Sequence, residues 1–307
     1  MNDKPLVAVV MGGMSAERAI SLQTGTAVCH ALEMLGYRFV TIDFDDAFVD
    51  SVRAHRPAAV FNALHGGAGE DGTVAALLEW LKVPYQGSGV LASAVAMDKW
   101  LTKAVMRFND IPTPTALLLH ERPDRPVSLP ERVGFPCVVK PAAQGSAVGV
   151  AIVRSAQELN NALRAAGEHG QPILAERYIE GREFTIAILD DQALPVVEIQ
   201  PRDSFYTYES KYTPGASVHT APARIPPERA ACMQDFALRL HRALGCRDYS
   251  RVDLLADASL DSLYVLECNA LPGLTPLSLF PDAAAAVGIS FEALIDTLVR
   301  SALSRCV

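Results

Sequence analysis

The sequence predicts an α/β protein whose N-terminal part is an open parallel sheet and whose remainder forms two smaller α+β regions. Residues 6–11 (LVAVVM) and 58–64 are apolar runs, and each is followed by a glycine-rich loop. Such runs are typical of strands that are buried on both faces of a parallel sheet. A helical pattern at residues 15–36 and a strand near residues 39–43 lie between them, which gives the strand–helix order of this fold class.

The glycine-rich loops are the first candidate ligand site, because open parallel sheets bind ligands beyond the carboxyl ends of their strands. Gly12 and Gly13 follow the first run, and His65 begins the second loop, HGGAG. His65 is either a ligand-binding group or a simple hydrogen-bonding residue. Glu17, in the expected first helical turn, either binds a ligand or caps the helix. The glycines lack the G-x-G-x-x-G spacing of a dinucleotide site, which argues against that reading.

The turn-rich segment PYQGSG at residues 84–89 predicts a domain boundary. We expect three domains, at residues 1–87, 88–177 and 178–307. The second is expected to contain helices at 91–109 and up to about 166, and strands at 137–140, 149–153 and 173–176. The third is expected to contain strands at 184–189, 196–200, 250–255 and 264–269 and a final helix at 291–304.

Composition excludes several classes of function. The chain has 307 residues, of which 50% are hydrophobic, and a formal net charge of −8. An acidic chain lacks the basic field that non-specific nucleic-acid binding requires. The six cysteines include no CxxC pair and are expected to be reduced and buried. No uncharged apolar run reaches the ~20 residues of a membrane span and no signal-peptide core precedes the first strand, so we expect a soluble cytoplasmic protein.

The first motif with chemical meaning is a lysine beside a Gly/Ser loop. Lys140 lies at the end of an apolar run, and the sequence QGSAVGV follows from Gln144. A lysine at the end of a buried strand places positive charge against a phosphate, and the backbone N–H groups of such a loop surround an anion. The lysine precedes the glycines, so this is not the GxxxxGK[ST] loop. The alternative is an ordinary turn between two strands.

The second motif is a set of polar side chains on two expected strands. Arg251 and Asp253 are two residues apart on one strand, and Glu267 and Asn269 on the other, so each pair shares a face. If the strands are neighbours, Asp253, Glu267 and Asn269 form an oxygen cluster suited to Mg²⁺. Arg251 beside them would stabilise charge that develops during group transfer. The alternative is a solvated antiparallel ladder, which the apolar neighbours disfavour.

The third motif is Glu176, at the end of an expected strand in the run ERYIEGRE. A hinge there presents backbone groups to a flat base, while the Glu176 carboxylate accepts a hydrogen bond from an exocyclic amine. The alternative is an ordinary exposed acidic turn.

The order of these motifs resembles that of the D-alanine–D-alanine ligase family over nearly the whole chain. The resemblance is carried by GGMSAERAISL, ALHGGAGEDGT, GSGVLASAVAMDK, VVKPAAQGSAVGV, EFTIAIL, YTYESKYTPG, SRVDLL and LECNALPGLTPLSL. It implies the ATP-grasp fold, in which two α+β domains clamp ATP beside an N-terminal α/β domain. It also implies ATP-dependent joining of two D-alanine molecules through an acyl phosphate, for peptidoglycan precursor synthesis. Two Mg²⁺ (or Mn²⁺) ions and a homodimer are implied as well, and activation by a monovalent cation is left open.

The resemblance further implies roles for particular residues. The implied ATP-binding residues are Lys99, Lys140 and Lys211 at the phosphates, Glu176, Ile179 and Phe205 at the base, and Glu183 at the ribose. The implied metal ligands are Asp253, Glu267 and Asn269. The implied catalytic group is Glu17, which orients the first D-alanine, together with Ser146, Tyr212, Arg251 and the backbone N–H of Gly273. The implied substrate pocket contains His65 near the first D-alanine and Ser278 and Leu279 near the second.

Several positions depart from the pattern of the family. Ala147 stands where many members have a serine, Cys268 and Ala270 replace common variants around Asn269, and Pro276-Leu277 replaces a Ser-His pair of some members. These departures make the selectivity for the second substrate the least determined property. None of them removes an implied metal ligand or phosphate-contacting lysine.

Two other functions are compatible with parts of this pattern. An ATP-grasp ligase could use D-lactate or D-serine as its second substrate, but relatives that use lactate lack a tyrosine at the position of Tyr212. A non-catalytic nucleotide-binding or scaffold protein predicts loss of Asp253, Glu267 or Asn269, and all three are present.

Overall fold

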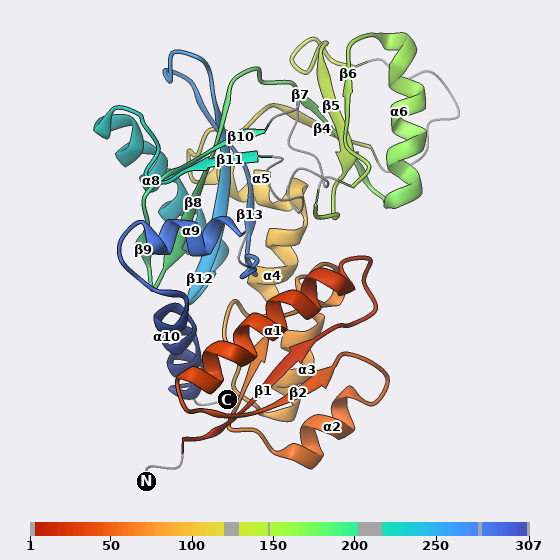
Figure 1. The fold of residues 1–307 in the computed structure, drawn as a ribbon. Helices are drawn as coiled ribbons and strands as arrows, with labels where there is room; N and C mark the ends of the chain where they lie inside the picture. Colours follow the sequence, from red (N-terminus) through yellow and green to blue (C-terminus); the bar gives the residue numbers. More distant parts are fainter. Residues whose placement is uncertain (1–3, 120–128, 147, 202–216, 276–277, 306–307) are drawn as a thin grey trace.

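The computed structural model describes residues 4–119, 129–146, 148–201, 217–275 and 278–305. The described residues form three sheets (Figure 1). The N-terminal sheet lies at the bottom of Figure 1, and the other two lie above it, the sheet with β8 and β12 on the left and the sheet with β5 and β6 on the right.

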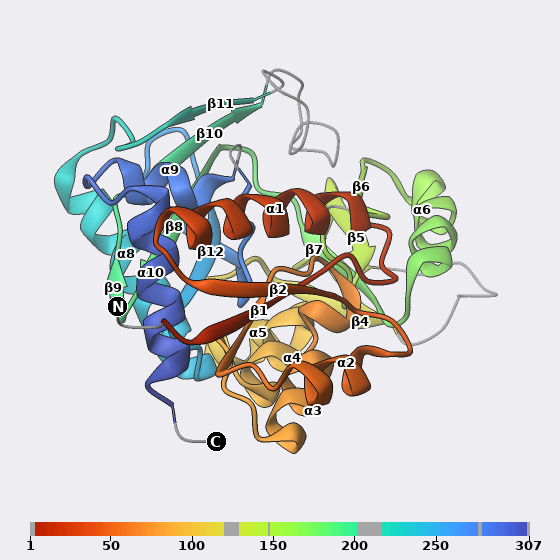
Figure 2. The same ribbon diagram turned by 60° about the horizontal axis from the view of Figure 1, so that its bottom comes forward.

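The N-terminal sheet is parallel, as predicted. Its strand order is β2-β1-β3, and both strand pairs are parallel. The central strand is apolar because Val7, Ala8, Val9 and Val10 are all buried. Figure 2 shows α1 lying along the sheet, with α10 of the distant C-terminus beside it. The elements are β1 (Leu6–Met11), α1 (Arg18–Met34), β2 (Arg38–Asp43), α2 (Phe48–His55), β3 (Ala59–Asn62), the 3₁₀ turn η1 (Gly67–Gly69), α3 (Thr73–Leu81) and α10 (Phe291–Leu303).

The second sheet is antiparallel and carries one helix, α6, on its outer face (Figure 1). Its strand order is β4-β7-β5-β6, and apolar residues of α6 such as Leu159 and Leu163 pack against Cys137 and Val139 of β5. The connection between the paired strands β5 and β6 contains Ser146. The elements are β4 (Ala116–Leu119), β5 (Cys137–Pro141), β6 (Ala151–Val153), α6 (Ala156–His169) and β7 (Ile173–Arg177).

The third sheet is also antiparallel, in the order β11-β10-β8-β12-β13, with β9 paired to β8. Its core strands β8 and β12 alternate inward apolar residues that pack against α8. The pairing of β12 with β13 places Asp253 opposite Glu267. The elements are β8 (Arg182–Leu189), β9 (Gln192–Ala193), β10 (Val197–Pro201), β11 (Ser217–Thr220), α8 (Pro227–Leu244), β12 (Tyr249–Ala256), β13 (Leu263–Asn269) and α9 (Leu279–Ala285).

The prediction of one helix at residues 91–109 is wrong, because the segment forms two helices, α4 (Val90–Met97) and α5 (Lys99–Phe108). Asp98 between them is extended, with φ −86° and ψ 104°. Its carboxylate accepts hydrogen bonds from the backbone N–H groups of Trp100 at 2.9 Å and Leu101 at 3.0 Å. An aspartate cap of this kind starts a new helix. Lys99 is therefore the first residue of α5, with its direction set by the cap.

Two further expectations concern cysteines and membranes. The five described cysteines are free thiols, and Cys137, Cys246 and Cys268 are buried. In the described part of the chain, no helix combines the length and apolarity that crossing a membrane requires.

Candidate active site

A pocket of about 540 Å³ lies between the second and third sheets. Its walls come from strands of both sheets and from the β5–β6 connection, so neither sheet forms it alone. Eight residues that the sequence analysis selected line this pocket: Lys99, Lys140, Ser146, Glu176, Ile179, Glu183, Asp253 and Glu267.

Apolar side chains complete the walls of the pocket, and the sequence analysis did not select them. Val138, Leu255 and Leu266 lie on the same strands as Lys140, Asp253 and Glu267. Their position beside the charged residues is the signal that could have identified them. They provide the flat apolar surface that a planar ring system requires.

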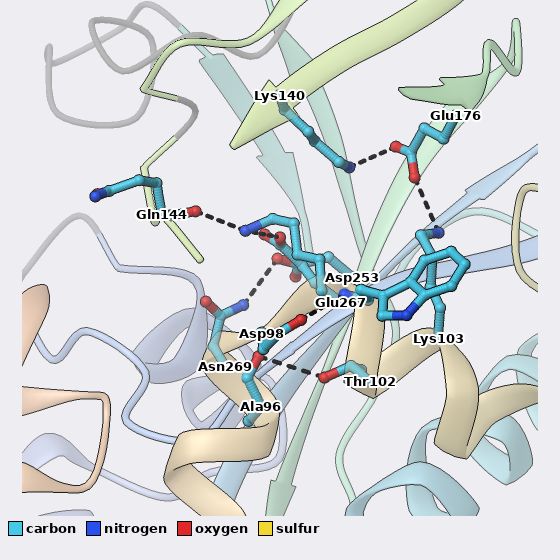
Figure 3. A network of polar contacts seen from close by, with 12 residues as sticks. Ala96, Asp98, Thr102, Lys103, Lys140, Gln144, Glu176, Asp253, Glu267 and Asn269 are labelled. Atoms are coloured by element: carbon cyan, nitrogen blue, oxygen red, sulfur yellow. Dashed lines mark hydrogen bonds and ion pairs between the residues drawn. The ribbon is translucent and has the colours of Figure 1, made fainter. Parts of the chain in front are cut away.

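Two lysines of the pocket are held by acceptors (Figure 3). The Lys99 ammonium donates to the backbone oxygen of Gln144 at 2.6 Å and lies 3.3 Å from Glu267 Oε2. Lys140 Nζ pairs with Glu176 Oε1. Both ammonium groups therefore lie at the pocket, where they can contact an anionic ligand.

Glu176 is a buried group, and the reading of it as an exposed acidic turn is wrong. It is only 3% exposed and pairs with Lys140 on one side and Lys103 on the other. Burial would raise the pKa of Glu176, but the charges of Lys103 and Lys140 outweigh it and lower the pKa to about 2. The carboxylate is therefore ionised throughout the neutral range and accepts hydrogen bonds only.

The predicted oxygen cluster forms because β12 and β13 are neighbours. Asn269 Nδ2 donates to Asp253 Oδ2 at 3.0 Å, and Arg251 donates to both Asp253 oxygens at 2.9 and 2.8 Å. Thr185 Oγ1 donates to Asp253 Oδ1 at 2.6 Å. Asp253 is only 6% exposed, so the alternative of a solvated ladder is wrong.

The donor set of this cluster fits a hard cation. Asp253, Glu267 and Asn269 bring carboxylate and amide oxygens to adjacent positions, which is the ligand chemistry of Mg²⁺. Within the described ranges, no group of three or more His, Cys, Asp or Glu side chains is arranged to hold a metal. The cluster falls outside that description because its third member is an asparagine.

A second group of predicted residues gathers where the N-terminal sheet meets the β5–β6 connection. Ser146 Oγ donates to Glu17 Oε1 at 2.5 Å, across 129 positions of sequence. Glu17 precedes α1 but its side chain makes no capping hydrogen bond, so its interpretation as a helix cap is wrong. Ser146 has φ +53°, an uncommon conformation for a residue with a side chain, of the kind that clusters at binding sites.

His65 lies beside this pair and is buried in the neutral form. Its Nε2 is 2.8 Å from Thr24 Oγ1, and its backbone oxygen accepts from Ser15 Oγ at 2.6 Å. Burial lowers the pKa of His65 to about 4, against the attraction of the Glu17 carboxylate. The histidine therefore carries no positive charge near neutral pH.

Gly273, His65 and Ser278 converge at one point. A Cβ atom on Gly273 would lie 3.0 Å from Ser278 Oγ and 3.1 Å from His65 Cε1, so the backbone approaches both side chains closely. Ser278 Oγ accepts from the Thr275 backbone N–H at 2.9 Å. The side chain of Leu279 is buried in the hydrophobic core, which leaves only its backbone for contact with a ligand.

Glu70 and Lys103 belong to the site, although the sequence analysis did not select them. Glu70 Oε1 accepts from the Gly66 backbone N–H at 2.7 Å. Burial raises the pKa of Glu70 to about 7, despite this hydrogen bond, and the charge of Glu17 adds to the effect. Glu70 lies within the glycine-rich loop motif, and Lys103 lies one helical turn after Lys99, which are the signals that could have revealed them.

Some sequence predictions concern residues that the structure does not describe. Phe205, Lys211 and Tyr212 lie outside the described residues, as do the departures at Ala147, Pro276 and Leu277. Their assigned roles stay predictions.

The complete arrangement matches a solved structure. The crystal structure of D-alanine–D-alanine ligase from Bacillus anthracis complexed with ATP superposes with a TM-score of 0.86 at 33% identity and covers 97% of each chain. With a charged pocket between two antiparallel sheets and a parallel N-terminal sheet beside it, the protein is an ATP-grasp enzyme of the ligase class.

Sequence comparisons narrow this class. Family models described as D-ala D-ala ligase N-terminus and C-terminus match residues 47–88 and 111–300. The D-alanine–D-alanine ligase of Desulforudis audaxviator is 45% identical over 304 residues, covering 97% of this chain and 99% of the relative. That of Methylobacterium radiotolerans is 45% identical over 303 residues, covering 96% and 97%. The chain belongs to the D-alanine–D-alanine ligase family.

Proposed function

We propose that this protein joins two D-alanine molecules to D-alanyl-D-alanine, using ATP and releasing ADP and phosphate. The observation that carries the proposal is the hydrogen bond between Ser146 and Glu17. It brings the loop beside the pocket lysines into contact with a carboxylate of the N-terminal sheet. A nucleotide and a small amine substrate bound at these two places would meet at this junction.

The proposed nucleotide site is the pocket between the second and third sheets. Glu176 and the backbone near Ile179 bind the base, and Glu183 binds the ribose. Lys99 and Lys140 bind the phosphates, with Lys211 as a third lysine. The size of the pocket, its apolar walls and its two ammonium groups support this assignment.

Asp253, Glu267 and Asn269 are the residues that would hold Mg²⁺ or Mn²⁺. When bound, such an ion neutralises phosphate oxygens and withdraws charge from the group being transferred. Lys99, 3.3 Å from Glu267, adds fixed positive charge at the same place.

The proposed D-alanine site is the group around Glu17, His65, Gly273 and Ser278. Glu17 binds the ammonium group of the first D-alanine, and neutral His65 lies beside it without repelling that charge. Ser278 and the backbone of Leu279 receive the carboxylate of the second D-alanine. Arg251 and the backbone N–H of Gly273 stabilise the oxyanion.

The proposed reaction has two steps. The carboxylate of the first D-alanine attacks the γ-phosphorus of ATP, which gives an acyl phosphate and ADP. The amine of the second D-alanine, after losing a proton, then attacks the acyl carbon, and phosphate leaves. Ser146, which donates a hydrogen bond to Glu17, and Tyr212 are proposed to assist that proton loss. The residues contribute mainly by positioning the reactants and neutralising charge.

The test is phosphate release in the presence of ATP and Mg²⁺, with D-alanine alone and with D-alanine plus D-lactate, and with products identified by mass. We expect release with D-alanine alone and formation of the dipeptide. Phosphate release only when D-lactate is present would mean that D-lactate, and not D-alanine, is the second substrate. ATP binding without phosphate release would favour a non-catalytic role.

The domain limits at residues 87/88 and 177/178 and a homodimer are further parts of the proposal. Each of the three sheets lies within one of the three proposed domains, which supports these limits. Helices α4 and α5, however, pack on the core of the third sheet. Limited proteolysis would check the limits, and light scattering would check the dimer.

A further inference from the structure

Glu176 lies between two lysines that come from different elements (Figure 3). Lys140, on β5, pairs with Oε1, and Lys103, on α5, lies 2.9 Å from Oε2. Glu176 is 3% exposed and the Lys103 side chain is fully buried, at 0%. A buried carboxylate needs a nearby cation, because burial without one strongly disfavours the ionised form.

The two lysines differ in what else they can do. Lys140 lines the pocket, where a phosphate group of a bound nucleotide can attract it. Lys103 does not line the pocket, and its ammonium also donates to Thr113 Oγ1 at 2.8 Å. Lys103 is therefore held on both sides inside the protein, and Lys140 is the lysine that is placed to exchange partners.

The Glu176 oxygen that faces Lys103 keeps capacity to accept a hydrogen bond. Among the described residues, Glu176 Oε2 is one of the few buried side-chain oxygens with no hydrogen bond of good geometry, although Lys103 Nζ is at ion-pair distance. A carboxylate oxygen has two lone pairs, so it can accept from a ligand while the cation stays beside it. Glu176 itself lines the pocket.

We propose that Lys103 is a positioning residue for recognition of the base: it holds Glu176 as a charged acceptor when Lys140 turns to the phosphates. The inference rests on the proposed nucleotide site and deepens it. Without Lys103, nucleotide binding would draw away Lys140, the other described cation that pairs with Glu176. Glu176 would then be a buried carboxyl group that takes up a proton, which makes it a weaker acceptor toward an exocyclic amine and lets its O–H donate to a carbonyl oxygen instead.

The charges around Glu176 agree with this role. Lys103 faces it from α5 and Lys140 from β5, and both lower its pKa against the effect of burial. Burial lowers the pKa of Lys103 to about 8 against the attraction of Glu176, and the charges of Lys140 and Arg107 add to this lowering. Arg177, the next residue on β7, is exposed. Within the described ranges, the charge of this carboxylate therefore depends on Lys103 and Lys140.

The test is direct binding of ATP and inosine triphosphate, which has an oxygen where ATP has the exocyclic amine, to wild type and Lys103→Met. We expect the wild-type preference for ATP to stay constant from about pH 8 to about pH 6, because Glu176 stays ionised. In Lys103→Met we expect ATP affinity to fall about tenfold over the same range and the preference over inosine triphosphate to disappear at the lower pH.

Matched variants separate positioning from a general loss of structure. Glu176→Gln, which is neutral at every pH, should lack the preference without any pH dependence. Met106→Ala removes a buried side chain of the same helix and should lower the melting temperature while both affinities stay flat with pH. If Lys103→Met does not fold, Thr113→Val, which removes the second hydrogen bond of Lys103, should show the same shift to a smaller extent.

The proposed role of Lys103 would be overturned if the ATP affinity of Lys103→Met or Thr113→Val does not change with pH and the preference over inosine triphosphate is kept. Equal weakening of both nucleotides at every pH would also overturn it, because that result describes a structural defect. Failure of the wild type to bind ATP would instead reject the proposed function, and with it the site on which this inference rests.

Discussion

The proposed nucleotide site around Glu176 (the nucleotide end) and the proposed D-alanine site around Glu17 and Glu70 (the D-alanine end) shift the pKa of a buried carboxyl group in opposite directions. At the nucleotide end, Glu176 lies between Lys103 and Lys140, and its pKa is lowered to about 2 against the effect of burial. At the D-alanine end, burial raises the pKa of Glu70 to about 7, with the charge of Glu17 acting in the same direction. One carboxyl group is permanently charged, and the other gains or loses its proton near neutral pH.

The difference follows from the charges of the proposed ligands. ATP brings several negative charges and no positive one, so its site requires cations that are fixed in advance. D-alanine is a zwitterion that brings one charge of each sign. A site with the half-buried carboxylate of Glu17 and a neutral His65 binds the ammonium group without an excess of buried charge.

The largest effect on activity is expected at Glu267, a proposed metal ligand. We expect Glu267→Gln to lower dipeptide formation by about a thousandfold or more, because the proposed metal ligand and the partner of Lys99 are lost together. Steady-state kinetics with Mg²⁺ present would measure this. Glu79→Gln, on α3 outside the pocket, is the matched control and should keep wild-type activity. An unchanged kcat in Glu267→Gln would contradict the metal assignment.

A smaller and one-sided effect is expected for Ser146→Ala. The variant loses the hydrogen bond to the Glu17 carboxylate, and charge-assisted bonds of this kind contribute about 1.5–3 kcal/mol. We expect KM for D-alanine to rise about tenfold or more while KM for ATP changes little. Ser290→Ala, which removes the cap of α10, is the control. A rise confined to KM for ATP would place Ser146 at the nucleotide end instead.

The two carboxyl groups should also give opposite dependences of stability on pH. The folded pKa of Glu70, about 7, is above its ordinary value of 4.5, so its contribution to stability declines as pH rises through this interval. The folded pKa of Glu176, about 2, is below 4.5, so its contribution is lost as pH falls below that value.

Urea denaturation of Glu70→Gln and wild type at several pH values tests this contrast. We expect the variant to gain on the order of 1–2 kcal/mol relative to wild type between pH 5 and pH 8, because it has no carboxyl group to ionise. The Glu176 carboxylate of the wild type stays ionised over that interval, so it contributes no change of this kind. If the free energy of unfolding depends on pH in the same way for Glu70→Gln and wild type, the proposed pKa shift of Glu70 is wrong.

The smallest effect is expected far from both ends, at the exposed pair Arg242–Asp191. The two side chains are each 56% exposed, and solvent screens such pairs strongly. Arg242→Met should therefore leave kcat, both KM values and the melting temperature within experimental error. A measurable change in either KM would mean that surface charge contributes to the contrast between the two ends.

The sequence by itself determined most of the strands that carry the site and the chemistry of each motif. The parallel sheet followed from apolar runs ended by glycines, because such runs are stable only when buried on both faces. The faces of β12 and β13 followed from the two-residue period of a strand, which put Arg251 with Asp253 and Glu267 with Asn269. The motif order gave the family and the assignment of Lys140 and Glu176.

Only the tertiary structure decided which residues share a charge environment. The pattern of residues 91–109 did not reveal the break at Asp98, because a cap depends on the local backbone and not on periodicity. From the sequence, Glu17 could either cap α1 or bind a ligand. In the structure its side chain makes no capping hydrogen bond and instead accepts from Ser146. Glu70 lies within a sequence motif and Lys103 follows Lys99 by one helical turn, but neither signal gives the charge environment of the side chain. Burial and the facing charges arise only when distant segments pack together.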